Sequence, residues 1–396
     1  MQGTPRANRP HIAIYGNRNA GKSSLLNAIV GQEISLVSNV KGTTTDPVTK
    51  TMELIPFGPV VFIDTAGLDD SGELGQLRVE RSKKILQRTD FAIYTHDIHD
   101  VDEDSFKHFL KEFKRFNIPY MVVFNKIDEA DEQLVQKYKD QYPEALYVSA
   151  MKETNVLELK DELIKRLEDG KEEETLIGDL VPYGGKVILV VPIDSEAPKG
   201  RIILPQVQII RDALDHGIKC YVTRDTELQE ALKEVPDADL VITDSQAFKE
   251  VNEMVPDHMP LTSFSIVFAR HKGDLWSFER GIQAIKDLKP GSKVLISESC
   301  THNHSHEDIG RVKIPRLLNK KLGFELDYHF KMGHDFPNDI KHFDMVIHCG
   351  SCMINKKTML NRITMCDEIG VPITNYGIVL AYINDILEPS LEMFRE

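Results

Sequence analysis

A glycine-rich pattern, G-x-x-x-x-G-K-[ST], occurs near the start of this chain and is matched by Gly16-Asn17-Arg18-Asn19-Ala20-Gly21-Lys22-Ser23. The apolar run HIAIY precedes it and the amphipathic stretch SSLLNAIV follows, so a strand enters the loop and a helix leaves it. In such a loop the backbone amides turn toward a phosphate, the lysine neutralises its charge, and the serine hydroxyl can ligate Mg²⁺. The segment therefore predicts a nucleotide-binding loop in an α/β fold.

Short apolar runs continue to alternate with amphipathic stretches as far as about residue 168. The predicted strands are HIAIYG, VVFIDTAG, FAIYTHD, IPYMVVFNKID and ALYVSA, with helices between them. This alternation is typical of a parallel sheet with helices on both faces. We expect a P-loop domain over residues 1–170.

Three further motifs stand at the ends of predicted strands, and they identify the nucleotide. Asp64-Thr65-Ala66-Gly67 offers a carboxylate to Mg²⁺ through water and a glycine amide to the γ-phosphate. In Asn125-Lys126-Ile127-Asp128 the carboxylate can accept two hydrogen bonds from guanine that adenine cannot donate, and Ser149-Ala150 suits the loop beside the guanine O6. We therefore predict a GTPase that hydrolyses GTP to GDP. The predicted nucleotide contacts are Gly16, Asn17, Asn19, Ala20, Gly21, Lys22, Ser23, Ser24, Asp64, Gly67, Asn125, Lys126, Asp128, Ser149 and Ala150.

These motifs resemble those of the TrmE-Era group of translation-factor-like GTPases over about residues 8–168. The resemblance implies that Gly42-Thr43-Thr44-Thr45-Asp46-Pro47 is a switch segment. Thr44, or else Thr43, then ligates Mg²⁺ together with Ser23 and Asp64. A threonine run of this kind is also what a solvated β-prone loop contains.

The catalytic device also departs from the Ras pattern. Ras-type enzymes place a glutamine after the D-x-x-G glycine to orient water, but this chain has Leu68 there. The TrmE-Era resemblance implies instead that Asn19 helps to hold K⁺ near the phosphates, where the cation offsets developing charge. The predicted catalytic residues are thus Lys22, Asn19 and Thr44, and hydrolysis is expected to be slow.

Two smaller α/β units are predicted after the charged, turn-prone stretch EDGKEEET. The middle unit, residues 171–268, contains predicted strands KVILVVPID, KCYVTR, DLVITD and SFSIVF. The last unit, residues 269–396, contains predicted strands KVLISES, FDMVIHCG and PITNYG. Amphipathic stretches between these runs predict helices, so both units are expected to be α/β.

Composition narrows the class of partner. The 396 residues carry a formal net charge of -14, which argues against binding to a nucleic-acid backbone. No run approaches the roughly 18 apolar residues of a membrane helix. The start MQGTPRANRP also lacks the apolar core of a signal peptide. We expect a cytoplasmic protein that does not contact a membrane.

Three of the five cysteines, Cys300, Cys349 and Cys352, follow two predicted strands of the last unit. Because parallel strands end at one edge of a sheet, the three thiolates can converge on zinc or on an iron-sulfur cluster. Buried core cysteines are the alternative, and they are the leading interpretation for Cys220 and Cys366. Nearby imidazoles follow in CTHNHSH and HCGSC, among which His302 is the preferred site residue.

A GTPase domain followed by C-x-H and H-C-x-x-C resembles the HydF family of di-iron (FeFe) hydrogenase maturation proteins. The resemblance spans the whole chain and implies a homodimer formed through the middle unit. It also implies a 4Fe-4S cluster on Cys300, Cys349 and Cys352, with His302 a possible ligand. The implied function is a scaffold that receives a di-iron precursor from two radical-SAM maturases and delivers it to apo FeFe hydrogenase.

Two alternatives from other classes remain open. One is an Era-like RNA or ribosome assembly GTPase with a structural metal site, which the acidic charge disfavours. The other is a zinc-stabilised regulatory GTPase that carries no cargo. Iron and sulfide content distinguishes both from the cluster scaffold.

Overall fold

A computed structural model describes residues 6–31, 48–65, 84–170, 175–193, 200, 202–299, 308–333, 335–337 and 339–395. The chain divides into two compact units, Met1–Glu172 and Glu173–Glu396. The two segments expected to act as switches, 34–47 with the run Gly42–Pro47 and 68–78 after Asp64-Thr65-Ala66-Gly67, lie outside the described residues, as do residues 300–307. Within the described ranges, no helix combines the length and the apolar character needed to cross a bilayer.

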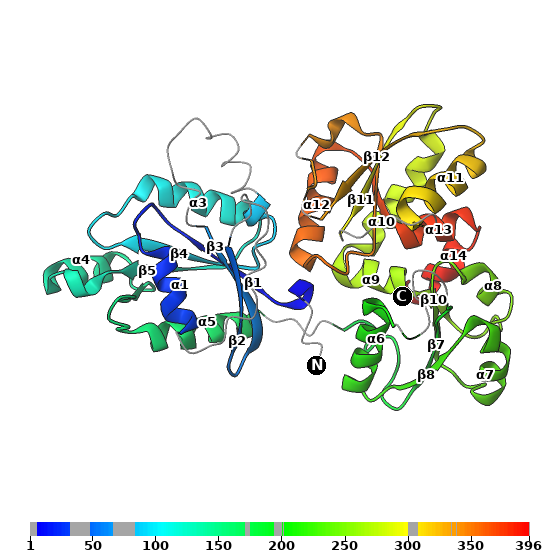
Figure 1. Ribbon diagram of the computed structural model, residues 1–396, viewed down its shortest axis with the longest axis horizontal. Helices are drawn as coiled ribbons and strands as arrows, with labels where there is room; N and C mark the ends of the chain where they lie inside the picture. The colour runs from blue at the N-terminus through cyan, green and yellow to red at the C-terminus, as the bar shows by residue number, and fades with distance from the viewer. Residues whose placement is uncertain are drawn as a thin grey trace. The chain divides into compact units, whose positions relative to one another are not determined.

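The first unit is built on a six-stranded sheet in the order β2-β3-β1-β4-β5-β6 (Figure 1). Every neighbouring pair is parallel except β2 and β3, which form an antiparallel hairpin at the edge. The strands are β1 His11–Tyr15, β2 Val48–Leu54, β3 Gly58–Asp64, β4 Phe91–Asp97, β5 Tyr120–Asn125 and β6 Leu146–Tyr147. The helices are α1 Lys22–Val30, α3 Glu103–Arg115, α4 Glu132–Gln141 and α5 Val156–Asp169, with short turns η1 Arg6–Asn8 and η2 Ile127–Glu129.

Side chains of β1 alternate between two hydrophobic clusters, as the period of a strand requires. Ile12 and Ile14 pack with the apolar faces of α1 and α5, whereas Ala13 and Tyr15 pack with α3. The central strand is therefore buried on both faces. This confirms the predicted α/β domain with helices on both sides of the sheet.

The second unit contains two four-stranded sheets, each wholly parallel. The first has the order β10-β9-β7-β8, with β7 Lys186–Val190, β8 Lys219–Thr223, β9 Leu240–Thr243 and β10 Leu261–Ser263. The second has the order β12-β11-β13-β14, with β11 Lys293–Glu298, β12 Asp327–Met332, β13 Met345–His348 and β14 Ile373–Asn375. The helices are α6 Leu204–Asp215, α7 Leu228–Glu234, α8 Phe248–Asn252, α9 Phe264–Lys272, α10 Leu275–Gln283, α11 Ile314–Leu322, α12 Lys356–Ile369, α13 Tyr376–Ile383 and α14 Leu387–Leu391. Shorter helical turns are η3 Asp225–Glu227, η4 Ala284–Asp287, η5 Ile309–Lys313, η6 Ile340–His342 and η7 Glu392–Phe394.

These two sheets are a duplication of one arrangement. In each, the first strand lies between the second and the third, and the fourth lies outside the third. In each half, the backbone N–H of the first residue of the first strand donates to the carboxylate of an aspartate that precedes the third strand. Lys186 donates to Asp239 at 2.8 Å, and Lys293 donates to Asp344 at 2.7 Å. The fourth strands also match in sequence, PLTSFSIV and PITNYGIV, and each runs directly into a helix.

The helix that follows each half of this duplication packs against the sheet of the other half. Helix α10 follows the first half but packs on β14 of the second, where a Cβ on Gly281 would come within 1.9 Å of the Ile373 carbonyl oxygen. Helix α14 follows the second half but packs on β10, where the Thr262 hydroxyl donates to the Ser390 carbonyl at 3.1 Å. The exchange places residues of both halves in one hydrophobic cluster.

One sequence expectation in this unit is wrong. The run SFSIVF, predicted as a strand, forms the start of α9. The hydroxyl of Ser263 caps this helix by accepting from the Ile266 N–H. Apolar residues cover most of the helix surface because α9 lies between the two halves, and such a run has no periodicity that distinguishes it from a buried strand.

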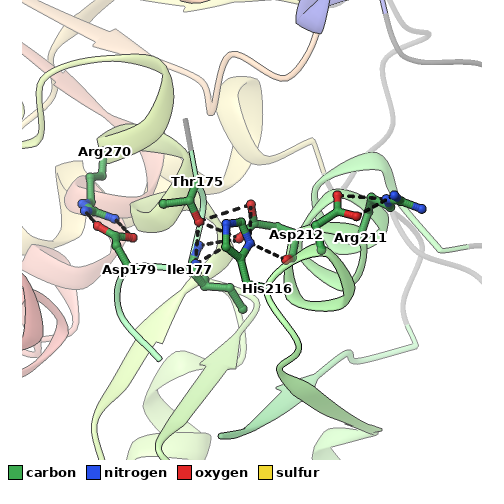
Figure 2. Close-up of polar contacts among 9 residues, drawn as sticks. Thr175, Ile177, Asp179, Arg211, Asp212, His216 and Arg270 are labelled. Carbon is green, nitrogen blue, oxygen red and sulfur yellow. Dashed lines mark hydrogen bonds and ion pairs between the residues drawn. The ribbon is translucent and has the colours of Figure 1, made fainter. Parts of the chain in front are cut away.

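The segment that leads into β7 is fastened to α6 (Figure 2). The carboxylate of Asp212 accepts from the backbone N–H of Ile177 at 2.8 Å and from the hydroxyl of Thr175 at 3.0 Å. Asp179 forms an ion pair with Arg270 of α9. These contacts make the residues after 174 an integral part of the second unit.

Candidate functional site

The glycine-rich loop joins β1 to α1, which begins at Lys22. The ammonium group of Lys22 is buried and donates to the carbonyls of Gly16 at 2.7 Å and Asn17 at 2.8 Å. Gly16 and Gly21 both have positive φ, and a Cβ on Gly16 would lie 2.1 Å from the Thr95 carbonyl oxygen. Both glycines are therefore required by the backbone, and the lysine is held over the loop.

A hydroxyl and a carboxylate meet beside this loop. The side chain of Ser23, at the start of α1, donates to the Asp64 carboxylate at the end of β3 with a distance of 2.7 Å. Oxygen ligands of this kind suit Mg²⁺, which takes one or two protein groups and keeps several waters. Two other predicted contacts, Thr44 and Gly67, lie outside the described residues.

Asn125 ties three of the predicted motifs together at one edge of the sheet. Its amide nitrogen donates to the Ala20 carbonyl at 3.1 Å, and its amide oxygen accepts from the Ala150 N–H at 3.0 Å. Ser149 is buried next to it, while Asp128 in η2 is exposed, as a group that meets a base must be. The geometry thus brings the phosphate loop, N-K-x-D and Ser149-Ala150 together.

Two acidic residues near this site were missed in the sequence analysis. The Asp97 carboxylate, at the end of β4, accepts from the Lys126 ammonium at 2.5 Å. Asp102 caps α3 and accepts from the Asn17 side chain at 3.1 Å. The Ser105 N–H and then Asn17 lower the pKa of Asp102, so it stays ionised. The strand ending FAIYTHD was the available signal for Asp97, since an acidic residue ends an apolar run.

Asn19 occupies the exposed turn of the loop with φ of 64°. Asparagine tolerates this left-handed conformation better than most residues do. The side chain therefore lies at the loop surface, where the sequence analysis predicts a K⁺ contact.

A second candidate site lies at the carboxyl ends of β11 and β13, which are adjacent parallel strands. The Cys349 sulfur accepts from the Ser299 N–H at 3.0 Å and donates to its hydroxyl at 3.1 Å. Ser299 immediately precedes Cys300, which lies outside the described residues together with His302. The residue before Cys300 is therefore in direct contact with the Cys349 sulfur.

The surroundings of Cys349 and Cys352 disfavour free thiolates. Burial raises the pKa of both thiols, that of Cys352 to about 11, so without a metal they are protonated at neutral pH. A bound cation reverses this balance because it deprotonates a coordinating thiol. Among the described residues, no three His, Cys, Asp or Glu side chains are grouped to hold a metal; Cys300 and His302, the other predicted site residues, lie outside them.

The remaining cysteines lie elsewhere. Cys366 is buried within α12, and Cys220 of β8 packs against the core of the first half. Both positions agree with core packing.

Both ring nitrogens of His348 have hydrogen-bond partners other than the cysteine sulfurs. Arg362 donates from Nη1 to its Nε2 at 2.6 Å, which leaves the ring proton on Nδ1 to be donated to the Cys349 carbonyl at 2.9 Å. Burial, with Arg362 as a second cause, lowers the pKa of His348 to about 3. This histidine is thus a neutral support for the cysteine loop.

Glu298 is a buried carboxylate that the sequence analysis also missed. It lies two residues before Cys300, and its Oε1 accepts from the Tyr376 hydroxyl at 3.2 Å. Arg311 lies 3.7 Å from its other oxygen. An acidic residue at the end of the apolar strand KVLIS was the available signal.

Three family models match this chain in succession. Residues 11–126 match a model described as 50S ribosome-binding GTPase. Residues 176–273 match the hydrogen maturase F dimerization domain, and residues 276–393 match the hydrogen maturase F tetramerization domain. The two hydrogen maturase F models together cover more than half of the chain.

Curated relatives of this chain include GTPases that it matches over only part of their length. The tRNA modification GTPase MnmE of Cytophaga hutchinsonii is 31% identical over 175 residues, which are 43% of this chain and 37% of that protein. GTPase Era of Clostridium kluyveri is 32% identical over 168 residues, which are 40% of this chain and 56% of that protein. Among solved structures, the G domain of the T. maritima FeoB iron transporter matches with a TM-score of 0.30 and 20% identity, covering 40% of this chain and 98% of that one.

Proposed function

Because the chain belongs to the hydrogen maturase F family, we propose that it is a GTPase-coupled scaffold for assembling a hydrogenase metal cluster. In this proposal it binds a 4Fe-4S cluster and delivers a di-iron precursor to apo FeFe hydrogenase. Radical-SAM maturases supply the precursor. Residues 1–170 bind GTP, residues 171–268 make the dimer contact and residues 269–396 carry the cluster.

The amino-terminal domain supports the GTPase part of this proposal. Lys22 neutralises phosphate charge, and Ser23 with Asp64 would hold Mg²⁺, which offsets charge on the β- and γ-phosphates. Asn125 fixes the loops around the base, where Asp128 selects guanine. Hydrolysis would gate association with partner proteins through the switch segments 34–47 and 68–78.

The contact between Ser299 and Cys349 is the observation that carries the scaffold proposal, because it links the Cys349-Cys352 turn to the residue before Cys300. Cys300, Cys349 and Cys352 would hold three irons of a 4Fe-4S cube, and the fourth would stay open to cargo or to a weaker ligand such as His302. Iron and sulfide after anaerobic reconstitution test this proposal. About four of each per chain are expected; zinc without sulfide would contradict it.

We propose that Asn19 supports hydrolysis by holding K⁺, since Leu68 cannot orient water. GTP turnover is therefore expected to be at least about tenfold faster in KCl than in NaCl, a difference of about 1.4 kcal/mol. Asn19→Ala should remove the difference between the two salts. The measurement is single-turnover hydrolysis at matched ionic strength, and equal rates for the unaltered protein would refute the proposal.

The dimer contact is proposed to involve strand β8, the open edge of the first sheet of the second unit. Tyr221 and Val222 are exposed on this strand, whereas the equivalent edge β12 carries the exposed polar side chains of Asp327 and His329, which are hydrogen-bonded to each other. Charged side chains discourage edge pairing, and apolar ones permit it. The apolar edge also lies within residues 176–273, the match to a dimerization domain.

Val222→Lys is expected to shift the protein to smaller species at micromolar concentration, because pairing would then bury a lysine from each copy. Light scattering coupled to size-exclusion chromatography measures the effect. Leu157→Lys is the matched control, since Leu157 is also an exposed aliphatic residue but lies on α5 of the first unit. Unchanged mass for Val222→Lys would place the contact elsewhere.

A further inference from the structure

The duplication provides an internal reference for the cysteine site. Equivalent positions follow from the paired anchors at the starts of the first and third strands. At the end of the first strand, Val190-Val191-Pro192 in one half corresponds to Ser297-Glu298-Ser299 in the other. On the third strand, Thr243 corresponds to His348. The first half therefore adopts the same fold without the side chains of Ser297, Glu298, Ser299 and His348. The fold does not require this polar layer beside the cysteines, which indicates that the layer serves the cysteine site.

Arg362 of α12 contacts two members of this polar layer, Ser297 and His348. Only 3% of it is exposed, and its guanidinium donates to Gly333 carbonyl at 2.7 Å and His348 Nε2 at 2.6 Å. A weaker bond of 3.4 Å reaches the Ser297 hydroxyl, and the group lies 4.8 Å over the Phe336 ring. Helix α8, which connects the third and fourth strands of the first half as α12 does in the second, contains no arginine.

The positive charge of Arg362 has only neutral hydrogen-bond partners among the described residues. Burial lowers its pKa to about 10, so it stays charged at neutral pH. A buried charge is strongly unfavourable without a counter-charge. The acidic groups that act on it are Cys349 and Cys366, and burial in α12 raises the pKa of Cys366 to about 12 and keeps that thiol neutral. Among the described residues, this leaves Cys349 as the group acting on Arg362 that becomes anionic when its sulfur binds a metal.

A second buried cation points to the same place. Lys272, at the end of α9, is 3% exposed, and its charge acts on Cys352. Two buried cations from different helices, Arg362 and Lys272, thus interact electrostatically with Cys349 and Cys352, respectively. Metal centres held by several thiolates are anionic, and buried cations compensate such a charge.

We propose that Arg362 is the fixed positive charge that balances the anionic metal-thiolate group at Cys349 and Cys352. Its hydrogen bond to His348 also positions the loop between them, since His348 donates to the Cys349 carbonyl. This role rests on the proposed function, which supplies the metal-thiolate group. Arg362 thus stabilises the metal-thiolate group through its charge and fixes the cysteine loop through its hydrogen bond to His348.

The reduction potential of the reconstituted protein tests the charge. Dithionite supplies one electron, which converts the cluster from the 2+ to the 1+ state and adds one negative charge. A fixed cation favours this reduced state. Arg362→Gln, which keeps an N–H for His348 but loses the charge, should lower the reduced-to-oxidised ratio at a given potential at least about tenfold, or 59 mV for one electron. Arg362→Lys should restore most of it.

Ser297→Val is the matched control, because the first half has valine there and the change removes only the weak bond to Arg362. Its potential should equal that of the unaltered protein. Circular dichroism and thermal unfolding establish that each variant is folded. An unchanged potential in Arg362→Gln, with iron content retained, would overturn the proposal.

Cobalt binding to the metal-free protein separates this proposal from the proposed function. A Co²⁺ ion on three thiolates is also anionic, so Arg362→Gln should weaken Co²⁺ binding at least about tenfold, followed by sulfur-to-cobalt absorption, and Arg362→Lys should recover it. If the unaltered protein takes up no sulfide but shows this pattern, the cluster proposal fails and the counter-charge stands. Equal Co²⁺ affinity in all variants would refute the counter-charge.

Discussion

Cys349→Ala and Cys352→Ala are each expected to lose most of the iron that the reconstituted protein binds, and Cys300→Ala the same. Two thiolates rarely hold a four-iron cube, so iron should fall from about four per chain to below about one. Anaerobic reconstitution followed by iron and sulfide analysis measures the loss. The visible absorption of the cluster should fall in parallel.

Two further cysteines provide the controls for this experiment. Cys220→Ala and Cys366→Ala remove a thiol of the same chain outside the proposed site, and both should keep their iron. His302→Ala should keep most iron but change the electron-paramagnetic-resonance spectrum of the reduced cluster. Full retention of iron in all three site variants would defeat the assignment, and loss of the cluster in His302→Ala would show that this histidine is required.

The convergence of the predicted nucleotide motifs could be anticipated because each motif is local in the sequence. The phosphate loop, Asp64 and the Asn125 segment each follow an apolar strand, and parallel strands deliver their carboxyl ends to one edge. Contacts between the motifs were beyond the sequence, since the link from Asn125 to Ala20 joins residues 105 positions apart. The pairing of Lys126 with Asp97 was hidden for the same reason.

The second unit was harder to predict because its two halves share a core. Helix α9 has no polar face that would identify it as a helix, and the exchange of α10 and α14 depends on contacts with the opposite half. The edge strand β12 was also missed, since DYHFKM alternates charged and aromatic residues without an apolar run. Tetramerization, which the family model for residues 276–393 names, was likewise absent from the sequence analysis.

Asp128→Asn is expected to weaken GTP binding by about 30-fold to 1,000-fold. The carboxylate would accept two hydrogen bonds from guanine, and losing a charge-assisted pair costs about 2 to 4 kcal/mol. The exposed position of Asp128 in η2, beside the loop that Asn125 fixes, leaves this carboxylate accessible to a base. Equilibrium binding of a fluorescent GTP analogue measures the loss.

A gain for another base would show that the effect is recognition rather than damage. Xanthine carries a carbonyl where guanine has its 2-amino group, and the asparagine amide can donate to that oxygen. Asp128→Asn should therefore prefer xanthosine triphosphate over GTP. Asp131→Asn is the matched control, because Asp131 caps α4 nearby and asparagine caps a helix equally well. Unchanged GTP affinity in Asp128→Asn would refute the role in base recognition, and equal loss of both nucleotides would show that the substitution perturbs the loop instead.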